Sequence, residues 1–123
     1  MIHILFVAAG GALGALARYG VATWLAPASS RIALPWGTIA VNLLGCLVIG
    51  VLMGLAQTRD GLSEGVRTFL MIGILGGFTT FSAFGLETVS LIRAGAASLV
   101  AANLALQVGG GLLAVWVGWA MST

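Results

Sequence analysis

Four long apolar stretches, separated by short polar segments, occupy almost the whole chain. They run over about residues 4–26, 34–57, 66–92 and 97–121. Each is long enough for a helix that crosses a bilayer, which needs roughly 20 apolar residues. A lone strand in lipid would leave its backbone groups unpaired, so each stretch is expected to be a helix. The pattern therefore predicts an all-α membrane protein in which residues 1–123 form a single four-helix transmembrane domain.

The segments between the stretches carry turn residues and most of the charges. Pro27-Ala28-Ser29-Ser30-Arg31 is expected to end the first helix, residues 58–64 form the most polar loop, and Arg93-Ala94-Gly95 closes the third helix. Tryptophans at both ends of the predicted bundle are typical of membrane interfaces; they are Trp24, Trp36, Trp116 and Trp119.

The composition excludes several classes of protein. Hydrophobic residues make up 60% of the chain and charged residues 7%, whereas a soluble domain carries about a quarter charged residues. A net charge of +2 is too small to indicate nucleic-acid binding. Cys46 is the single cysteine, so no intrachain disulfide forms. We expect no signal peptide, because Met1-Ile2-His3 lacks a basic segment.

The arginines do not specify an orientation in the membrane. In the predicted topology Arg59 and Arg67 fall on the side of the N-terminus, and Arg31 and Arg93 fall on the other side. The positive-inside rule therefore favours neither orientation. We hypothesise that the chain inserts both ways and pairs with an inverted copy of itself; the alternative is one orientation set by weaker cues.

The third stretch contains the strongest local pattern, in residues 73–84. Gly76 and Gly77 are followed by Thr79 and Thr80, and both residue types support a helix poorly. We expect a helix break here, near mid-membrane. Non-helical backbone at that depth is tolerated when it is buried in protein or lines water, and its carbonyls can bind a cation. The alternative is an unbroken helix whose hydroxyls bond to their own preceding carbonyls.

Two polar stripes and three glycine pairs mark other helix faces. Thr38 and Asn42 lie four apart in the second stretch, as do Asn103 and Gln107 in the fourth. Such side chains either join helices or line a route for a solute through the membrane. The hydroxyls of the third stretch favour a lined route; these belong to Thr79, Thr80 and Ser82.

Small residues four apart let helices approach closely; the pairs are Gly10 and Gly14, Gly50 and Gly54, and Gly73 and Gly77.

Phe81 and Phe84 lie three apart, on one helix face. The positive edges of two aromatic rings can meet an anion in a narrow dry passage, although two such rings also serve ordinary packing.

Arg18 and Glu87 do not form a titratable chain across the bundle, as a proton relay would need. The sequence contains no nucleophile–base pair, metal-ligand cluster or phosphate loop. It therefore favours passive permeation over coupled transport and over an enzyme.

Three motifs resemble the fluoride channel family, Fluc, also called CrcB. They are Gly76-Gly77-Phe78-Thr79-Thr80-Phe81-Ser82-Ala83-Phe84 with Glu87 three residues beyond, Gly10-Gly11-Ala12-Leu13-Gly14-Ala15-Leu16-Ala17-Arg18-Tyr19, and Pro35-Trp36-Gly37-Thr38-Ile39-Ala40-Val41-Asn42-Leu43-Leu44-Gly45. The resemblance covers essentially the whole chain, in order. It implies an antiparallel, dual-topology homodimer in a bacterial inner membrane, with two pores between the subunits that export toxic fluoride down its gradient.

The resemblance also implies roles for individual residues. Phe81 and Phe84 match the phenylalanines whose ring edges face the ion, and Asn42 matches the asparagine that orients them. Gly76 and Thr79 match the residues whose carbonyls hold a structural Na⁺ shared across the dimer. Arg18 matches an arginine near the aqueous vestibule, and smaller roles fall to Thr80, Ser82 and Glu87.

The fourth helix departs from the pattern of the family. Asn103 and Gln107 fall on the polar track that lines the pore in the family, but the later positions are Gly111 and Val115. Two other functions stay open. A small dual-topology multidrug transporter would want a carboxylate deep in the first helix, which has only Arg18. A non-transporting membrane assembly subunit would use the glycines and polar stripes for packing alone.

Overall fold

The computed structural model describes residues 1–57 and 61–123, and it is all helical in that part of the chain. The α-helices are α1 (Ile2–Ile32), α2 (Trp36–Ala56), α3 (Glu64–Arg67), α4 (Leu75–Phe78), α5 (Phe81–Arg93), α6 (Ala97–Leu104) and α7 (Gly110–Ala120). Two π-helical segments, η1 (Thr68–Ile74) and η2 (Ala105–Gly109), continue the neighbouring helices. They join into four spans that are long and apolar enough to cross a membrane: Ile2–Arg31, Trp36–Ala56, Glu64–Arg93 and Ala97–Ala120. The predicted loop residues Thr58, Arg59 and Asp60 lie outside the described residues.

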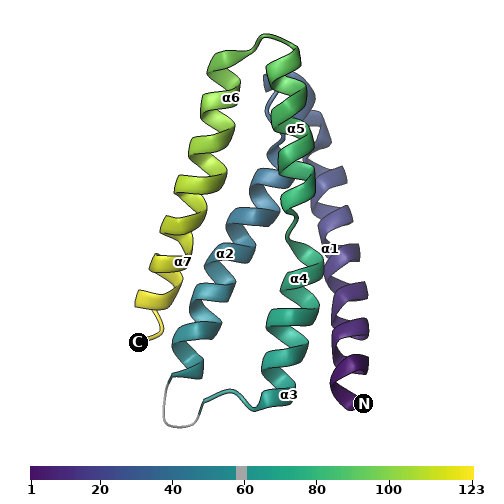
Figure 1. The fold of residues 1–123 in the computed structure, drawn as a ribbon, viewed down its shortest axis with the longest axis vertical. Coiled ribbons are helices and arrows are strands. Elements are labelled where there is room, and N and C mark those ends of the chain that lie inside the picture. Colours follow the sequence, from purple (N-terminus) through teal and green to yellow (C-terminus); the bar gives the residue numbers. More distant parts are fainter. Residues whose placement is uncertain (58–60) are drawn as a thin grey trace.

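The spans form an elongated bundle in which neighbouring spans run in opposite directions (Figure 1). Both termini and α3 lie at one end, and the connection from α5 to α6 lies at the other (Figure 1). The main packing is of α2 against α7 and of α1 against η1 and α4. This arrangement places α2, the third span and the fourth span around one central region.

The third span is interrupted at Thr79 and Thr80. Thr79 has φ −82° and ψ 157°, and Thr80 has φ −151° and ψ 117°, so two extended residues separate α4 from α5. This supports in part the prediction of a break within residues 73–84. Gly76 and Gly77 remain helical within α4. Of the poor helix formers in this segment it is the two threonines that leave the helix, and the tertiary contacts described below explain why.

The first helix extends beyond its predicted end near residue 26. Pro27 lies inside α1 and does not end it. A proline removes only one backbone donor, and the hydroxyls of Ser29 and Ser30 each donate to a carbonyl of the preceding turn. The helix ends where Ala33 takes the left-handed φ of 59° and its N–H donates to the Ser29 carbonyl over 2.9 Å.

All three glycine pairs lie where helices approach closely, as predicted. A Cβ on Gly14 would overlap the Ile74 carbonyl, and one on Gly77 would overlap the Gly11 carbonyl. A Cβ on Gly50 would likewise overlap the Val115 carbonyl. The small residues therefore bring α1 against the third span and α2 against α7.

Candidate functional site

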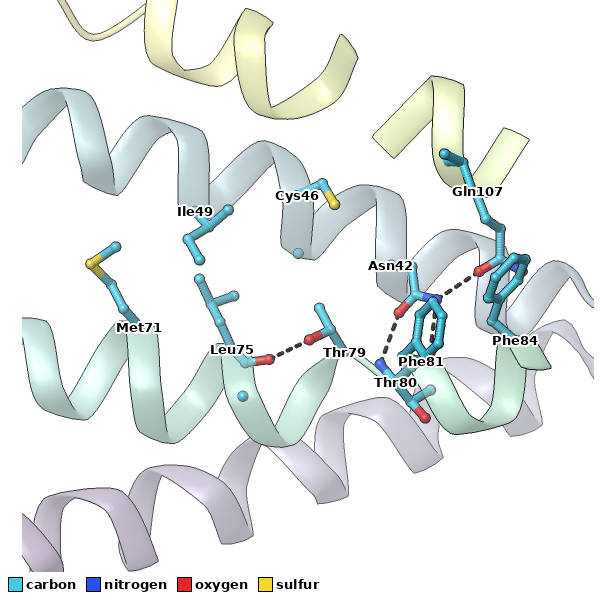
Figure 2. A pocket seen from close by; sticks show the side chains of 13 residues that line it. Asn42, Cys46, Ile49, Met71, Leu75, Thr79, Thr80, Phe81, Phe84 and Gln107 are labelled. Atoms are coloured by element: carbon cyan, nitrogen blue, oxygen red, sulfur yellow. Dashed lines mark hydrogen bonds between the residues drawn. The ribbon is translucent and has the colours of Figure 1, made fainter. Parts of the chain in front are cut away.

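The side chain of Asn42, on α2, makes the two bonds that hold the interruption of the third span open. Its Oδ1 accepts a hydrogen bond from the Thr80 N–H over 2.9 Å, and its Nδ2 donates to the Thr80 carbonyl over 3.0 Å. Figure 2 shows the amide facing the Thr80 backbone. Since buried backbone groups must be paired, Asn42 replaces the helical bonds that Thr80 has lost.

The hydrogen bonding continues from Asn42 into the fourth span and back to α5. Asn42 Nδ2 also donates to Gln107 Oε1 over 2.6 Å, and Gln107 Nε2 donates to Asn103 Oδ1 over 2.9 Å. Asn103 Nδ2 donates to Thr88 Oγ1 over 3.0 Å, and that hydroxyl donates to the Phe84 carbonyl over 2.7 Å. We call this series, from the Thr80 backbone to the Phe84 carbonyl, the amide chain. It joins α2, the fourth span and α5 around the interruption.

An open groove of about 340 Å³ lies beside the interruption, between α2, the third span and η2. It is lined by Asn42, Gly45, Cys46, Ile49, Met71, Leu75, Gly76, Thr79, Thr80, Phe81, Phe84, Gln107 and Val108 (Figure 2). The described residues that line it include no Asp, Glu, His, Lys or Arg. The groove therefore offers neutral donors and apolar walls, with no fixed charge.

The two phenylalanines of the groove are close together but differ in exposure. Their ring centroids are 5.4 Å apart, with the planes tilted by 55°. Phe84 is 8% exposed, whereas Phe81 is 81% exposed. Phe84 thus belongs to the core of the chain, and Phe81 stands at its surface.

A second cavity of about 520 Å³ lies on the α1 side of the interruption. Arg18, Thr38 and Glu87 line it, and Thr80 lines both cavities. Thr38 Oγ1 donates to Glu87 Oε1 over 2.5 Å. Glu87 Oε2 is buried and has no hydrogen-bond partner among the described residues. The charged candidates therefore line a different cavity from the two phenylalanines.

The carbonyls of Gly76 and Thr79 are among those at the interruption that lose the donors a continuous helix would give them. The Thr80 N–H, which would reach the Gly76 carbonyl, bonds to Asn42 instead. The Ala83 N–H, which would reach the Thr79 carbonyl, donates to Thr80 Oγ1 over 3.3 Å and caps α5. Gly76 and Thr79 both line the groove.

The structure brings most predicted site residues to these two cavities. The groove collects Asn42, Gly76, Thr79, Thr80, Phe81, Phe84 and Gln107, and the second cavity collects Arg18 and Thr38. Ser82 lines neither cavity, although its hydroxyl lies 3.2 Å from Thr80 Oγ1. Asn103 lines neither cavity and is 0% exposed.

The sequence reasoning missed Thr88 and Cys46. Thr88 lies four residues after Phe84, so helical spacing could have placed its hydroxyl near that carbonyl, but nothing local indicates its bond to Asn103. Cys46 lies four residues after Asn42 and lines the groove. That spacing on one helix face was available from the sequence.

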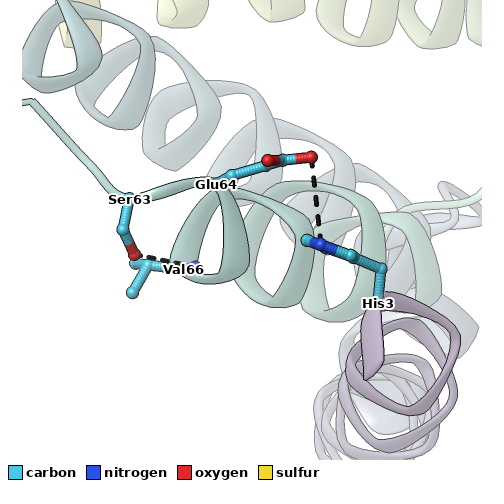
Figure 3. Close-up of polar contacts among 4 residues, drawn as sticks. All are labelled: His3, Ser63, Glu64 and Val66. Atoms are coloured by element: carbon cyan, nitrogen blue, oxygen red, sulfur yellow. Dashed lines mark hydrogen bonds and ion pairs between the residues drawn. The ribbon is translucent and has the colours of Figure 1, made fainter. Parts of the chain in front are cut away.

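One further polar contact lies at the end of the bundle, away from both cavities. His3 Nε2 is 3.9 Å from Glu64 Oε1, beside the Ser63 hydroxyl that accepts from the Val66 N–H (Figure 3). The two side chains are 45% and 87% exposed, and exposed pairs stabilise a protein little. This contact is therefore a surface feature of the α1 and α3 ends.

Comparison with known proteins agrees with these observations. The family model described as "CrcB-like protein, Camphor Resistance (CrcB)" matches residues 5–119. The chain is 48% identical over 118 residues to the fluoride-specific ion channel FluC of Chloroflexus aurantiacus, covering 96% of this chain and 93% of that protein. It is 45% identical over 121 residues to the FluC of Rhizobium etli, covering 98% and 96%, and 42% identical over 119 residues to that of Methylobacillus flagellatus, covering 97% and 93%. With four spans able to cross a membrane, this chain is a multi-pass membrane protein of the CrcB family.

Proposed function

We propose that this chain is a fluoride-specific ion channel that exports cytoplasmic fluoride passively, confers fluoride resistance and catalyses no reaction. The observation that carries the proposal is the uncharged groove at the interruption, lined by neutral donors and two phenylalanines, in a chain whose relatives are named fluoride-specific channels. Fluoride passes down its gradient, so no titratable relay is needed.

The chemistry of the groove suits a small anion. Fluoride is a strong hydrogen-bond acceptor, and bonds to an ionised acceptor are about twice as strong as neutral ones. Thr80 and Gln107 provide hydroxyl and amide groups on the groove, with Ser82 beside Thr80. The edges of Phe81 and Phe84 carry partial positive charge. These groups together replace part of the hydration of the ion.

The groove is open on one side in a single chain, and we propose that an inverted second copy closes it. The exposure of Phe81, at 81%, supports this, because a ring that guides an ion needs walls around it. An antiparallel homodimer, inserted with dual topology, also fits the balance of arginines between the two sides. Cysteine-accessibility labelling of Arg31→Cys and Arg59→Cys tests the topology: each position labels from both sides, and single-sided labelling would refute it.

Na⁺ is proposed as a structural ion at the dimer interface, held by backbone carbonyls. The carbonyls of Gly76 and Thr79 fit this role, because their helical donors bond elsewhere and both residues line the open groove. Two carbonyls from each copy would give four oxygen ligands. Bound there, Na⁺ would supply a positive charge beside the carbonyls of the interruption.

Fluoride efflux from liposomes that contain the purified protein tests the function. Liposomes loaded with fluoride should release it rapidly when an ionophore compensates the charge, and protein-free liposomes should not. A multidrug transporter would instead exchange cationic drugs for protons, and a non-transporting assembly subunit would release nothing. Absence of fluoride release from correctly assembled protein would refute the proposal.

A further inference from the structure

We infer that Thr88 and Asn103 are positioning residues that aim one N–H of Gln107 into the groove as a fluoride donor. The inference rests on the proposed fluoride pathway and adds two residues that do not touch the ion. It follows from the direction of the amide chain and from the different burial of its members.

The direction of the amide chain is fixed by backbone groups at its ends. The Thr80 N–H can only donate, so Asn42 presents Oδ1 to it and Nδ2 to the Thr80 carbonyl. Nδ2 is then also the atom facing Gln107, which must offer Oε1. At the other end the Phe84 carbonyl can only accept, so the single hydroxyl proton of Thr88 points to it and Thr88 Oγ1 accepts from Asn103. The two ends therefore agree on which atom of each side-chain amide, in Asn42, Gln107 and Asn103, is the oxygen and which is the nitrogen.

This direction decides which amide has a proton left for an anion. An amide nitrogen carries two protons. Asn42 Nδ2 uses both, on the Thr80 carbonyl and on Gln107 Oε1. Gln107 Nε2 uses one on Asn103 Oδ1, and its second proton bonds to no atom of the described chain. Because Gln107 lines the groove with Phe84, its second proton is the free amide donor there.

Asn103 and Thr88 act through Gln107. Asn103 is 0% exposed and lines neither cavity, so it does not meet an ion. Its Oδ1 holds Gln107 Nε2, and its own Nδ2 is held by Thr88 Oγ1. Without the Thr88 hydroxyl, the Asn103 amide would leave a buried donor unpaired, which is costly. It would turn away in search of another acceptor and release Gln107.

Replacement of the Thr88 hydroxyl tests this arrangement. Thr88→Val keeps the shape of the side chain and removes the hydroxyl, so the rate of fluoride efflux should fall about fivefold, the effect of losing one hydrogen bond. Thr88→Ser keeps the hydroxyl and should stay within about twofold of the unmodified protein. Thr23→Val is the matched control. Thr23 also donates to the carbonyl four residues earlier, over 2.9 Å, but the described residues give it no link to the amide chain.

A double variant separates positioning from general structure. In Gln107→Ser the amide chain is already cut at Gln107, so adding Thr88→Val should not lower the efflux further, because interaction between the two sites makes their effects non-additive. An equal further loss would overturn the inference. If Gln107→Ser conducts no fluoride, the efflux rates of Thr88→Val and Thr88→Ser decide whether the Thr88 hydroxyl has the positioning role. Size-exclusion chromatography checks assembly, and Thr88→Ala replaces Thr88→Val if the latter does not assemble.

The outcomes also distinguish this inference from the proposed function. No efflux from the unmodified protein refutes the function itself. Efflux from the unmodified protein that is unchanged in Thr88→Val refutes the positioning role alone. Equal losses in Thr88→Val and Thr88→Ser would also refute it, since the hydroxyl would then not be the group that matters.

Discussion

Substitution of Asn42 by leucine should stop fluoride passage, because the interruption of the third span depends on one side chain. Leucine has nearly the size of asparagine but makes no hydrogen bonds. Asn42→Leu removes the bond from the Thr80 N–H, the bond to the Thr80 carbonyl and the bond to Gln107 Oε1. Three polar groups therefore lose a partner in one substitution.

The cost can be worked out from where those groups lie. Leaving a buried polar group unpaired costs about 1–3 kcal/mol. Thr80 and Gln107 are only partly buried, so the lower figure applies, giving about 3 kcal/mol in total. This is about a hundredfold in an equilibrium constant. Thr80 can recover part of it by resuming a helical bond to the Gly76 carbonyl, which straightens the span and removes the site.

Two measurements on the same preparation separate these effects. The efflux of fluoride from liposomes should fall by about a hundredfold or more, and the unfolding midpoint in detergent should fall only modestly, because a straightened span is still folded. Gln57→Leu is the matched control. Gln57 directly follows the second span and does not line the groove, and it loses one bond, from Trp119 Nε1 over 3.2 Å, at an exposed site. Its efflux should match that of the unmodified protein.

One result would refute the reasoning. If Asn42→Leu released fluoride within about twofold of the unmodified rate, an effect below 0.5 kcal/mol, then Asn42 would not hold the interruption open. The interruption would then have another cause, such as the propensity of residues 76–80 alone.

Three other changes have expected outcomes. Phe81→Ile should abolish fluoride efflux while the proposed dimer still assembles on size-exclusion chromatography, because it removes an aromatic edge at an exposed position; unmodified efflux would exclude the ring-edge role. Replacement of Na⁺ by a bulky organic cation should weaken the proposed dimer or its efflux, measured by the same two assays, and indifference would argue against the proposed carbonyl site. Gly14→Ala should destabilise the protein in thermal unfolding by about 1–3 kcal/mol, because the added Cβ overlaps the Ile74 carbonyl. Its control, Gly20→Ala, has open space around the added Cβ and should be neutral or stabilising. Equal effects of the two substitutions would contradict the close packing at Gly14.

The four spans could be predicted from the sequence because each one meets a local requirement. A stretch of apolar residues with turn residues at its ends must be helical in lipid wherever its neighbours lie. The glycine pairs could be predicted for the same reason, since close approach needs small residues four apart. The end of α1 could not, because the turn signal of Pro27 to Arg31 is overridden and the helix continues through the proline to Ile32.

The position of the interruption and the different roles of the polar stripes needed the structure. The local sequence predicts a break somewhere in residues 73–84 without fixing its residues, and Asn42, on another helix, supplies the bonds that make it favourable at Thr80. Asn103 and Gln107 look alike as two amides four apart. Only the packing shows that one is fully buried and the other lines the groove. Such differences arise from neighbours distant in sequence, which no local pattern encodes.

The interruption provides donors and acceptors at one place from a chain that has few of either. A continuous helix would pair the Gly76 and Thr79 carbonyls within itself and leave the Thr80 hydroxyl no N–H to cap. Asn42 takes the N–H that would pair the Gly76 carbonyl, and Thr80 Oγ1 takes the one that would pair the Thr79 carbonyl, in two residues that line the groove. The direction imposed by the same bond also runs through Gln107 and leaves one of its protons free for an anion. A single side-chain amide is therefore the link between the two proposed ion sites, and Asn42→Leu should disturb both of them.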